Sequence, residues 1–127
     1  MNWDFKEGRP IYTQIVDQMS LFIASGAVKP GERLPSVRDL AMEAGVNPNT
    51  MQRSLSELER QGLLHSERTS GRFVTDDEGV LKKLRSDLSM DYIKELFENL
   101  EKLGLTGDEI IWAVTDYAKH EKERKGE

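Results

Sequence analysis

Residues 36–62 read SVRDLAMEAGVNPNTMQRSLSELERQG, and this stretch predicts two short helices joined by a tight turn. Ser36, with an aspartate three residues later, forms a capping pattern, so the first helix should begin here and stop at Gly45. Asn47-Pro48 is an N-cap followed by a first-turn proline, which opens the second helix. The Gly-Val-Asn segment between the two helices is then a turn.

The second of these helices has two faces of opposite character. Its apolar residues recur at helical spacing and predict a buried stripe, made of Met51, Leu55 and Leu58. The polar residues of its first two turns fall largely on the other face and are Asn49, Thr50, Gln52 and Arg53. Amide side chains suit adenine edges and arginine suits guanine or phosphate, so this face is chemically able to read DNA.

Two further patterns flank the helix pair. Residues 10–26 begin with Pro10 as a first-turn proline and carry apolar residues at three- and four-residue spacing, which predicts an amphipathic helix. Residues 63–65 and 73–75 read as short strands joined by a polar connection. Three helices followed by a hairpin, with a turn between the second and third helices, is the order of a winged helix-turn-helix.

This order places other polar residues where DNA would lie. The N-terminal residues of the second helix of such a motif meet base edges in the major groove. Arg38 is placed to reach a phosphate or a base edge, and Arg68 and Arg72 at the hairpin tip are placed to reach phosphates or the minor groove. Gly71 would let the backbone approach the phosphates closely.

The charge of the chain is unevenly distributed. With 18 Lys plus Arg against 23 Asp plus Glu, the net charge is −5, which taken alone argues against nucleic acid. Residues 1–75 carry nine of each sign, whereas residues 76–127 carry nine basic and fourteen acidic side chains. A neutral domain can still gather its arginines on one face, so DNA binding is compatible with this distribution.

Residues 76–127 return to a helical pattern. The apolar phase slips between Leu88 and Ile93, which predicts a kink or break near Ser89–Asp91, and Thr106 with Glu109 forms a second capping box. Two helices can hardly enclose a cofactor, so we expect none and assign their apolar stripes to a homodimer interface. The predicted interface residues are Leu84, Leu88, Ile93, Leu96, Phe97, Leu100, Leu103, Ile111 and Val114.

These patterns predict a mainly α fold with a small β-hairpin. Residues 1–75 form a winged helix-turn-helix DNA-binding domain, and residues 76–127 form a helical dimerisation region with a charged tail. The alternative that stays open is a winged-helix protein-interaction module without DNA binding.

Other classes find little support in the residues. The chain has no cysteine, no phosphate-cradling glycine loop and no credible triad, so we expect no enzyme. His65 and His120 lie far apart in the sequence and lack ligand-spaced partners, so we expect no metal site. Trp3, Tyr12 and Trp112 are interpreted as packing or interface residues. With no apolar stretch long enough to span a membrane, we expect a soluble, cytoplasmic protein.

Several ordered motifs resemble the winged-helix domain of the GntR family of bacterial regulators. They are PIYTQI (10–15), GAVKPGERLPSVRDLA (26–41), VNPNTMQRSLSELE (46–59) and GLL (62–64). The PIY opening, the NPNT segment and the short two-helix C-terminal part further resemble the YtrA subfamily.

The resemblance implies a dimeric repressor that binds pseudo-palindromic, double-stranded operator DNA. It carries DNA contact onto Ser36, Arg38, Asn49, Thr50, Arg53 and Gly71. Members that resemble the YtrA branch commonly control transporter genes, so the resemblance implies such targets here. The expected partners are operator DNA and a second copy of the chain, and the residues name no small-molecule effector.

Overall fold

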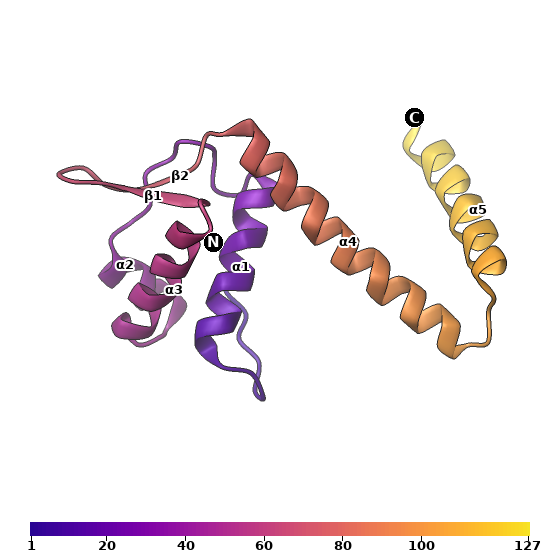
Figure 1. Cartoon of the computed structure of the whole chain (residues 1–127), viewed down its shortest axis with the longest axis horizontal. Coiled ribbons are helices and arrows are strands. Elements are labelled where there is room, and N and C mark those ends of the chain that lie inside the picture. The colour runs from indigo at the N-terminus through magenta and orange to yellow at the C-terminus, as the bar shows by residue number, and fades with distance from the viewer. The chain divides into compact units, whose positions relative to one another are not determined.

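The computed structural model describes the whole chain, Met1–Glu127, as five helices and one antiparallel hairpin (Figure 1). The elements in chain order are α1 (Ile11–Ser25), α2 (Val37–Ala44), α3 (Pro48–Arg60), β1 (Leu64–Glu67), β2 (Gly71–Val74), α4 (Glu78–Lys102) and α5 (Gly107–Lys125). This confirms the predicted mainly α winged helix-turn-helix with two further helices. By its internal contacts the chain divides into two compact units, Met1–Ser86 and Asp87–Glu127.

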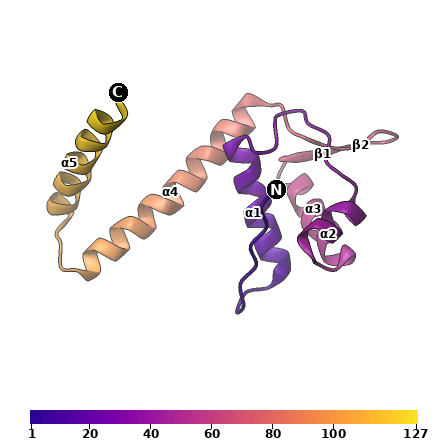
Figure 2. The same cartoon turned by 180° about the vertical axis from the view of Figure 1, so that it is seen from behind.

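The first unit packs α1, α2 and α3 together with the hairpin around one apolar core, and the hairpin tip projects beyond the helices (Figure 1 and Figure 2). The core side chains are Ile15, Met19, Ile23, Val28, Leu34, Leu40, Ala41, Met51, Leu55, Leu58, Leu63, Leu64, Val74 and Leu81. Leu81 belongs to the first turn of α4, and Leu84 packs against the same core from the next turn. Leu84, a predicted dimer-interface residue, therefore contacts the winged-helix core within its own chain.

Local capping sets the helix starts. Ser36 Oγ accepts a hydrogen bond from the Asp39 amide at 3.1 Å, and Asn47 Oδ1 accepts one from the Asn49 amide at 2.8 Å. Both caps confirm the capping patterns of residues 36–62. Pro10 was wrongly placed inside the first turn, because its ψ of 139° is extended and makes it the N-cap residue before α1.

The hairpin is longer than predicted, and a third segment pairs with it. The polar residues at 66–67 and 71–72 continue the strands, because backbone pairing runs from Leu64↔Val74 out to Glu67↔Gly71 and needs no apolar side chain. The predicted connection 66–72 therefore shrinks to residues 68–70. On the other edge of β2, residues 31–34 form backbone hydrogen bonds of 2.9 Å with Arg72 and Val74.

The predicted break near Ser89–Asp91 is wrong, because α4 runs without interruption from Glu78 to Lys102. No proline or glycine follows Gly79 in this helix, so the backbone has no cause to bend there. The apolar phase slips because the side chains before Leu88 serve the winged-helix core, whereas those after it belong to the second unit.

The second unit contains residues 87–102, the larger part of α4, and all of α5. The predicted capping box is confirmed, since Thr106 Oγ1 accepts from the Glu109 amide and the Glu109 carboxylate accepts from the Thr106 amide. Ile110 is its one fully buried apolar residue. No helix of the chain is long and apolar enough to cross a membrane.

A half-buried ion pair fastens the hairpin to α3. Arg72 Nε donates to Glu59 Oε1 at 2.6 Å, and the hydroxyl of Ser66 donates to the same carboxylate. Burial raises the pKa of Glu59, but the hydrogen bonds from Arg72 and Ser66 outweigh burial and hold that pKa below its ordinary value of 4.5. Glu59 is therefore ionised at neutral pH and ties β2 to the helix.

We expect Glu59→Gln to lower the free energy of unfolding by about 1 kcal/mol at pH 7, because Arg72 loses its charged acceptor. A carboxyl whose folded pKa is lowered stabilises the fold above its unfolded pKa and loses that contribution as pH falls. The difference in the free energy of unfolding between wild type and variant should therefore disappear as the pH falls below 4.5. Urea unfolding from pH 7 downward measures it, and Glu7→Gln, an exposed residue of the same unit that forms no ion pair, is the control; a gap that persists at low pH would contradict the assignment.

Candidate nucleic-acid interface

The first two turns of α3 present a polar surface on a rigid base. Met51 and Leu55 are buried beneath it, whereas Asn49, Gln52 and Arg53 are exposed and Thr50 is half-buried. The Asn47 cap and the first-turn Pro48 fix where the helix begins. Exposed donors thus stand at the positive end of the helix dipole, which favours a negatively charged partner.

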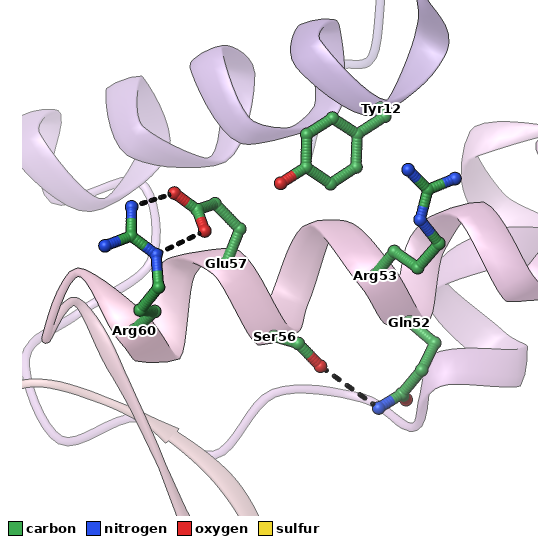
Figure 3. A pocket seen from close by; sticks show the side chains of 6 residues that line it. All are labelled: Tyr12, Gln52, Arg53, Ser56, Glu57 and Arg60. Atoms are coloured by element: carbon green, nitrogen blue, oxygen red, sulfur yellow. Dashed lines mark hydrogen bonds and ion pairs between the residues drawn. The ribbon is translucent and has the colours of Figure 1, made fainter.

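Arg53 is held in place by an aromatic ring from α1. Its guanidinium carbon lies 4.9 Å from the centroid of the Tyr12 ring, within the range of a cation–π contact. Figure 3 shows Tyr12 between Arg53 on one side and the Glu57–Arg60 pair on the other. The sequence predicts Tyr12 to be a packing or interface residue, and the long-range contact that orders Arg53 gives no signal in it.

These side chains line a shallow hollow between α1 and α3. Its lining is Tyr12, Gln52, Arg53, Ser56, Glu57 and Arg60. Gln52 Nε2 donates to Ser56 Oγ at 3.3 Å along one side of the hollow (Figure 3). The amide oxygen of Gln52 therefore remains available outward, together with the donors of Arg53.

The two charges at the far end of the hollow neutralise each other. Arg60 Nε donates to Glu57 Oε2 at 2.7 Å, and the hydrogen bonds from Arg60 and Gln61 lower the pKa of Glu57 to about 2. Glu57 is thus ionised and bound to Arg60 at neutral pH. Arg53 is the cation of this hollow that keeps its charge for a partner.

The arginines of residues 1–75 likewise divide into those that pair with a carboxylate and those that do not. Arg9, Arg60 and Arg72 each pair with a carboxylate. The arginines without a carboxylate partner are Arg33, Arg38, Arg53 and Arg68, and all four are exposed. A region of zero net charge therefore still displays a set of unneutralised guanidinium groups, which is the electrostatic footprint that DNA binding needs.

The other predicted contact residues fall at three places. Ser36 caps α2, and Arg38 is exposed in the first turn of that helix. Arg68 lies in the exposed connection at the hairpin tip. Gly71 opens β2 with a φ of 106°, a conformation that favours glycine, and Arg72 follows it with its guanidinium on Glu59 instead of at the tip.

The second unit presents a separate, apolar surface. Large side chains stay exposed there, among them Leu103 at 74%, Trp112 at 71% and Tyr117 at 68%. The predicted interface residues of this unit that are exposed are Ile93, Leu96, Leu103, Ile111 and Val114, while Leu88, Phe97 and Leu100 are half-buried. Trp112, Tyr117, Met90 and Tyr92 extend the exposed set beyond the predicted residues. Apolar exposure on this scale is typical of a surface that binds a partner.

Known proteins match both parts of the chain. The family model of bacterial regulatory proteins of the gntR family matches residues 11–74. The HTH-type transcriptional regulator YhcF of Bacillus subtilis is 33% identical over 119 residues, covering 94% of this chain and 98% of YhcF. The HTH-type transcriptional repressor YtrA of the same organism is 37% identical over 97 residues, covering 76% of this chain and 72% of YtrA.

Solved structures agree. A GntR family transcriptional regulator from Listeria monocytogenes superposes with a TM-score of 0.79 at 33% identity, covering 88% of this chain and 98% of that one. The DNA-binding domain of AraR in complex with its operator ORR3 matches with a TM-score of 0.51 at 28% identity, covering 59% of this chain and 90% of that domain. The chain therefore belongs to the GntR family of DNA-binding bacterial transcription regulators, in the YtrA subfamily.

Proposed function

We propose that the protein is a homodimeric repressor that binds a pseudo-palindromic operator. The observation that carries this proposal is the surface of α3, where exposed amide and guanidinium groups stand on a fully buried base. In this assignment the major groove is read by Asn49, Thr50, Gln52 and Arg53. The operator-bound AraR domain, which shares the fold, supports DNA as the partner.

The remaining predicted residues position the domain on the duplex. Ser36 and Arg38 contact the backbone from the start of α2, and Arg68 with Gly71 brings the wing to phosphates or the minor groove. Arg72 is assigned a smaller share, because it must leave or share Glu59 before it can bind a phosphate. Arg53 needs less ordering on binding, because Tyr12 already restricts its side chain.

The N-terminal and C-terminal regions have different proposed roles. We assign DNA binding to residues 1–75 and dimerisation to residues 76–127, where the exposed apolar side chains need a partner surface. Two copies would place two reading heads on half-sites about 34–36 Å apart, one turn of the duplex. Repression follows in the cytoplasm when the bound dimer occludes a promoter, and transporter genes are the proposed targets.

Selection of bound sequences from a random duplex pool tests this proposal directly. A dimeric operator reader enriches a two-fold palindrome whose binding persists at salt concentrations that abolish non-specific binding. A pool that shows no enrichment, and only weak salt-sensitive binding, would contradict the proposal and favour a winged-helix module that binds protein.

The reading face predicts a specific loss of affinity. We expect Arg53→Ala or Arg38→Ala to weaken binding of the selected duplex by about 1–3 kcal/mol, because each removes an exposed cation without a carboxylate partner. Both variants should stay folded, although Arg53→Ala also removes the cation–π contact with Tyr12. Fluorescence anisotropy measures the affinity. Glu57→Gln combined with Arg60→Ala is the matched control, since it removes a mutually neutralised pair from the same helix and leaves no carboxylate unpaired; equal affinities of the Arg53 variant and wild type would remove Arg53 from the site.

The apolar surface of the second unit predicts the oligomeric state. We expect Leu96→Asp to yield monomers, because a buried carboxylate in a protomer interface costs several kcal/mol. Light scattering reports the mass, and the same variant should lose affinity for a two-half-site duplex far more than for a single half-site. Asn99→Asp adds the same acid at an exposed polar position of the same helix and should remain dimeric; an intact Leu96→Asp dimer would place the interface elsewhere.

A further inference from the structure

The backbone of Arg33 is fixed to the edge of the wing. Arg33 forms an antiparallel bridge with Phe73 of β2, and the neighbouring amide of Leu34 donates to the Arg72 carbonyl at 2.9 Å. Leu34 is buried in the core with 4% of its surface exposed. Because side chains alternate along an extended segment, the Arg33 side chain lies on the opposite, outer face of the wing.

The outer face gives Arg33 a defined position next to Gly71. Residues directly opposite in a ladder share a face, so Arg33 and Phe73 lie together, and Gly71 is the next residue of β2 on that face toward the tip. A Cβ at Gly71 would lie 3.1 Å from Nε and 3.5 Å from Nη2 of Arg33. The guanidinium therefore spreads over the bare glycine and is directed along the wing toward its tip.

The charge of Arg33 is not neutralised within the chain. Arg33 is exposed and has no carboxylate partner. The adjacent Glu32 turns away, since its Oε1 accepts from the Lys29 amide at 3.1 Å. Arg72, on the inner face of the wing, is paired with Glu59. Glu67 is opposite Gly71 on the outer face, and its Oε1 lies 3.7 Å from His65 Nε2. The wing thus displays two arginines without an ion pair, Arg33 on its outer face and Arg68 at its tip.

An arginine that is ordered by the backbone beneath it and lacks an acid partner is suited to an anion that presents two oxygens to its guanidinium, as a phosphodiester does. We infer that Arg33 is a further DNA contact of the wing and binds a backbone phosphate beside the groove that the tip enters. This inference rests on the proposed function. It also gives Gly71 a second role, because a Cβ there would press against the Arg33 guanidinium and force it to shift.

The slope of affinity against salt tests the inference. The labelled duplex from the selection and a scrambled duplex are titrated by anisotropy at about 50 and 200 mM salt with the wild type and Arg33→Gln. A lost phosphate contact lowers the logarithmic slope by about 0.9, so over this range wild type should lose roughly threefold more affinity than the variant. Because a phosphate contact reads no sequence, Arg33→Gln should weaken both duplexes by the same factor.

Two control variants distinguish a phosphate contact by Arg33 from a purely structural role of this side chain. Lys29→Gln removes a charge from the same connection between α1 and α2 and should keep the wild-type slope, as should Arg33→Lys, which keeps the charge. A wild-type slope for Arg33→Gln overturns the inference, and so does an equal drop for Lys29→Gln. A lower melting temperature with an unchanged slope shows that Arg33 only packs on the wing, which overturns it too.

The same titration distinguishes a failure of the proposed function from a failure of the Arg33 contact. If wild type binds the selected duplex no better than the scrambled one, the proposed operator function fails and the inference fails with it. If wild type is selective and Arg33→Gln binds identically at every salt concentration, only the role of Arg33 is lost.

Discussion

The packing of α3 on α1 is the constraint on which the DNA-binding surface depends. Met51, Leu55 and Leu58 are fully buried, and so is Ser54, whose hydroxyl lies 2.9 Å from the Thr50 carbonyl oxygen of its own helix and 3.2 Å from the Tyr12 carbonyl oxygen of α1. This close approach of the two helices, together with the buried apolar stripe, sets the rotation of α3 on α1. Because packing fixes the buried face of α3, it also fixes the direction in which the exposed face of this helix points. The same contact brings the Tyr12 ring under Arg53, and Glu59 near the end of α3 receives Arg72 of the wing.

The α3 helix also separates its charges along its length. Its first turns carry donors at the positive end of the dipole, whereas its carboxylates, Glu57 and Glu59, lie in the second half. If these carboxylates were unpaired, they would repel the phosphates of DNA, because salt screens charges poorly within an interface. Each is instead bound by an arginine, which removes the repulsion and at the same time withdraws Arg60 and Arg72 from the cationic set. Intramolecular pairing, more than net charge, therefore decides which arginines face a partner.

Apart from Pro10, which is the N-cap of α1 and not a first-turn residue, the helix starts that depend on neighbours along the chain could be predicted from the sequence. Caps at Ser36 and Asn47 and the capping box at Thr106 are local, so each was placed correctly. Features that depend on residues distant in the sequence could not be predicted. Periodicity showed that the apolar phase changes after Leu88, but a change of packing partner produces the same pattern as a kink, and the backbone is continuous.

The candidate site shows the same division between local and distant effects. Helical spacing separated the buried and exposed faces of α3, and the exposed residues were assigned from it. Spacing could not show that Arg72 is bound by Glu59, 13 residues earlier, or that Arg33 reaches Gly71 across the wing. A single winged-helix head with four unneutralised arginines can make only a few phosphate contacts, and each is weakened by salt. In the proposed homodimer a second head at high effective concentration would raise the affinity, and this links the exposed apolar side chains of α4 and α5 to DNA binding.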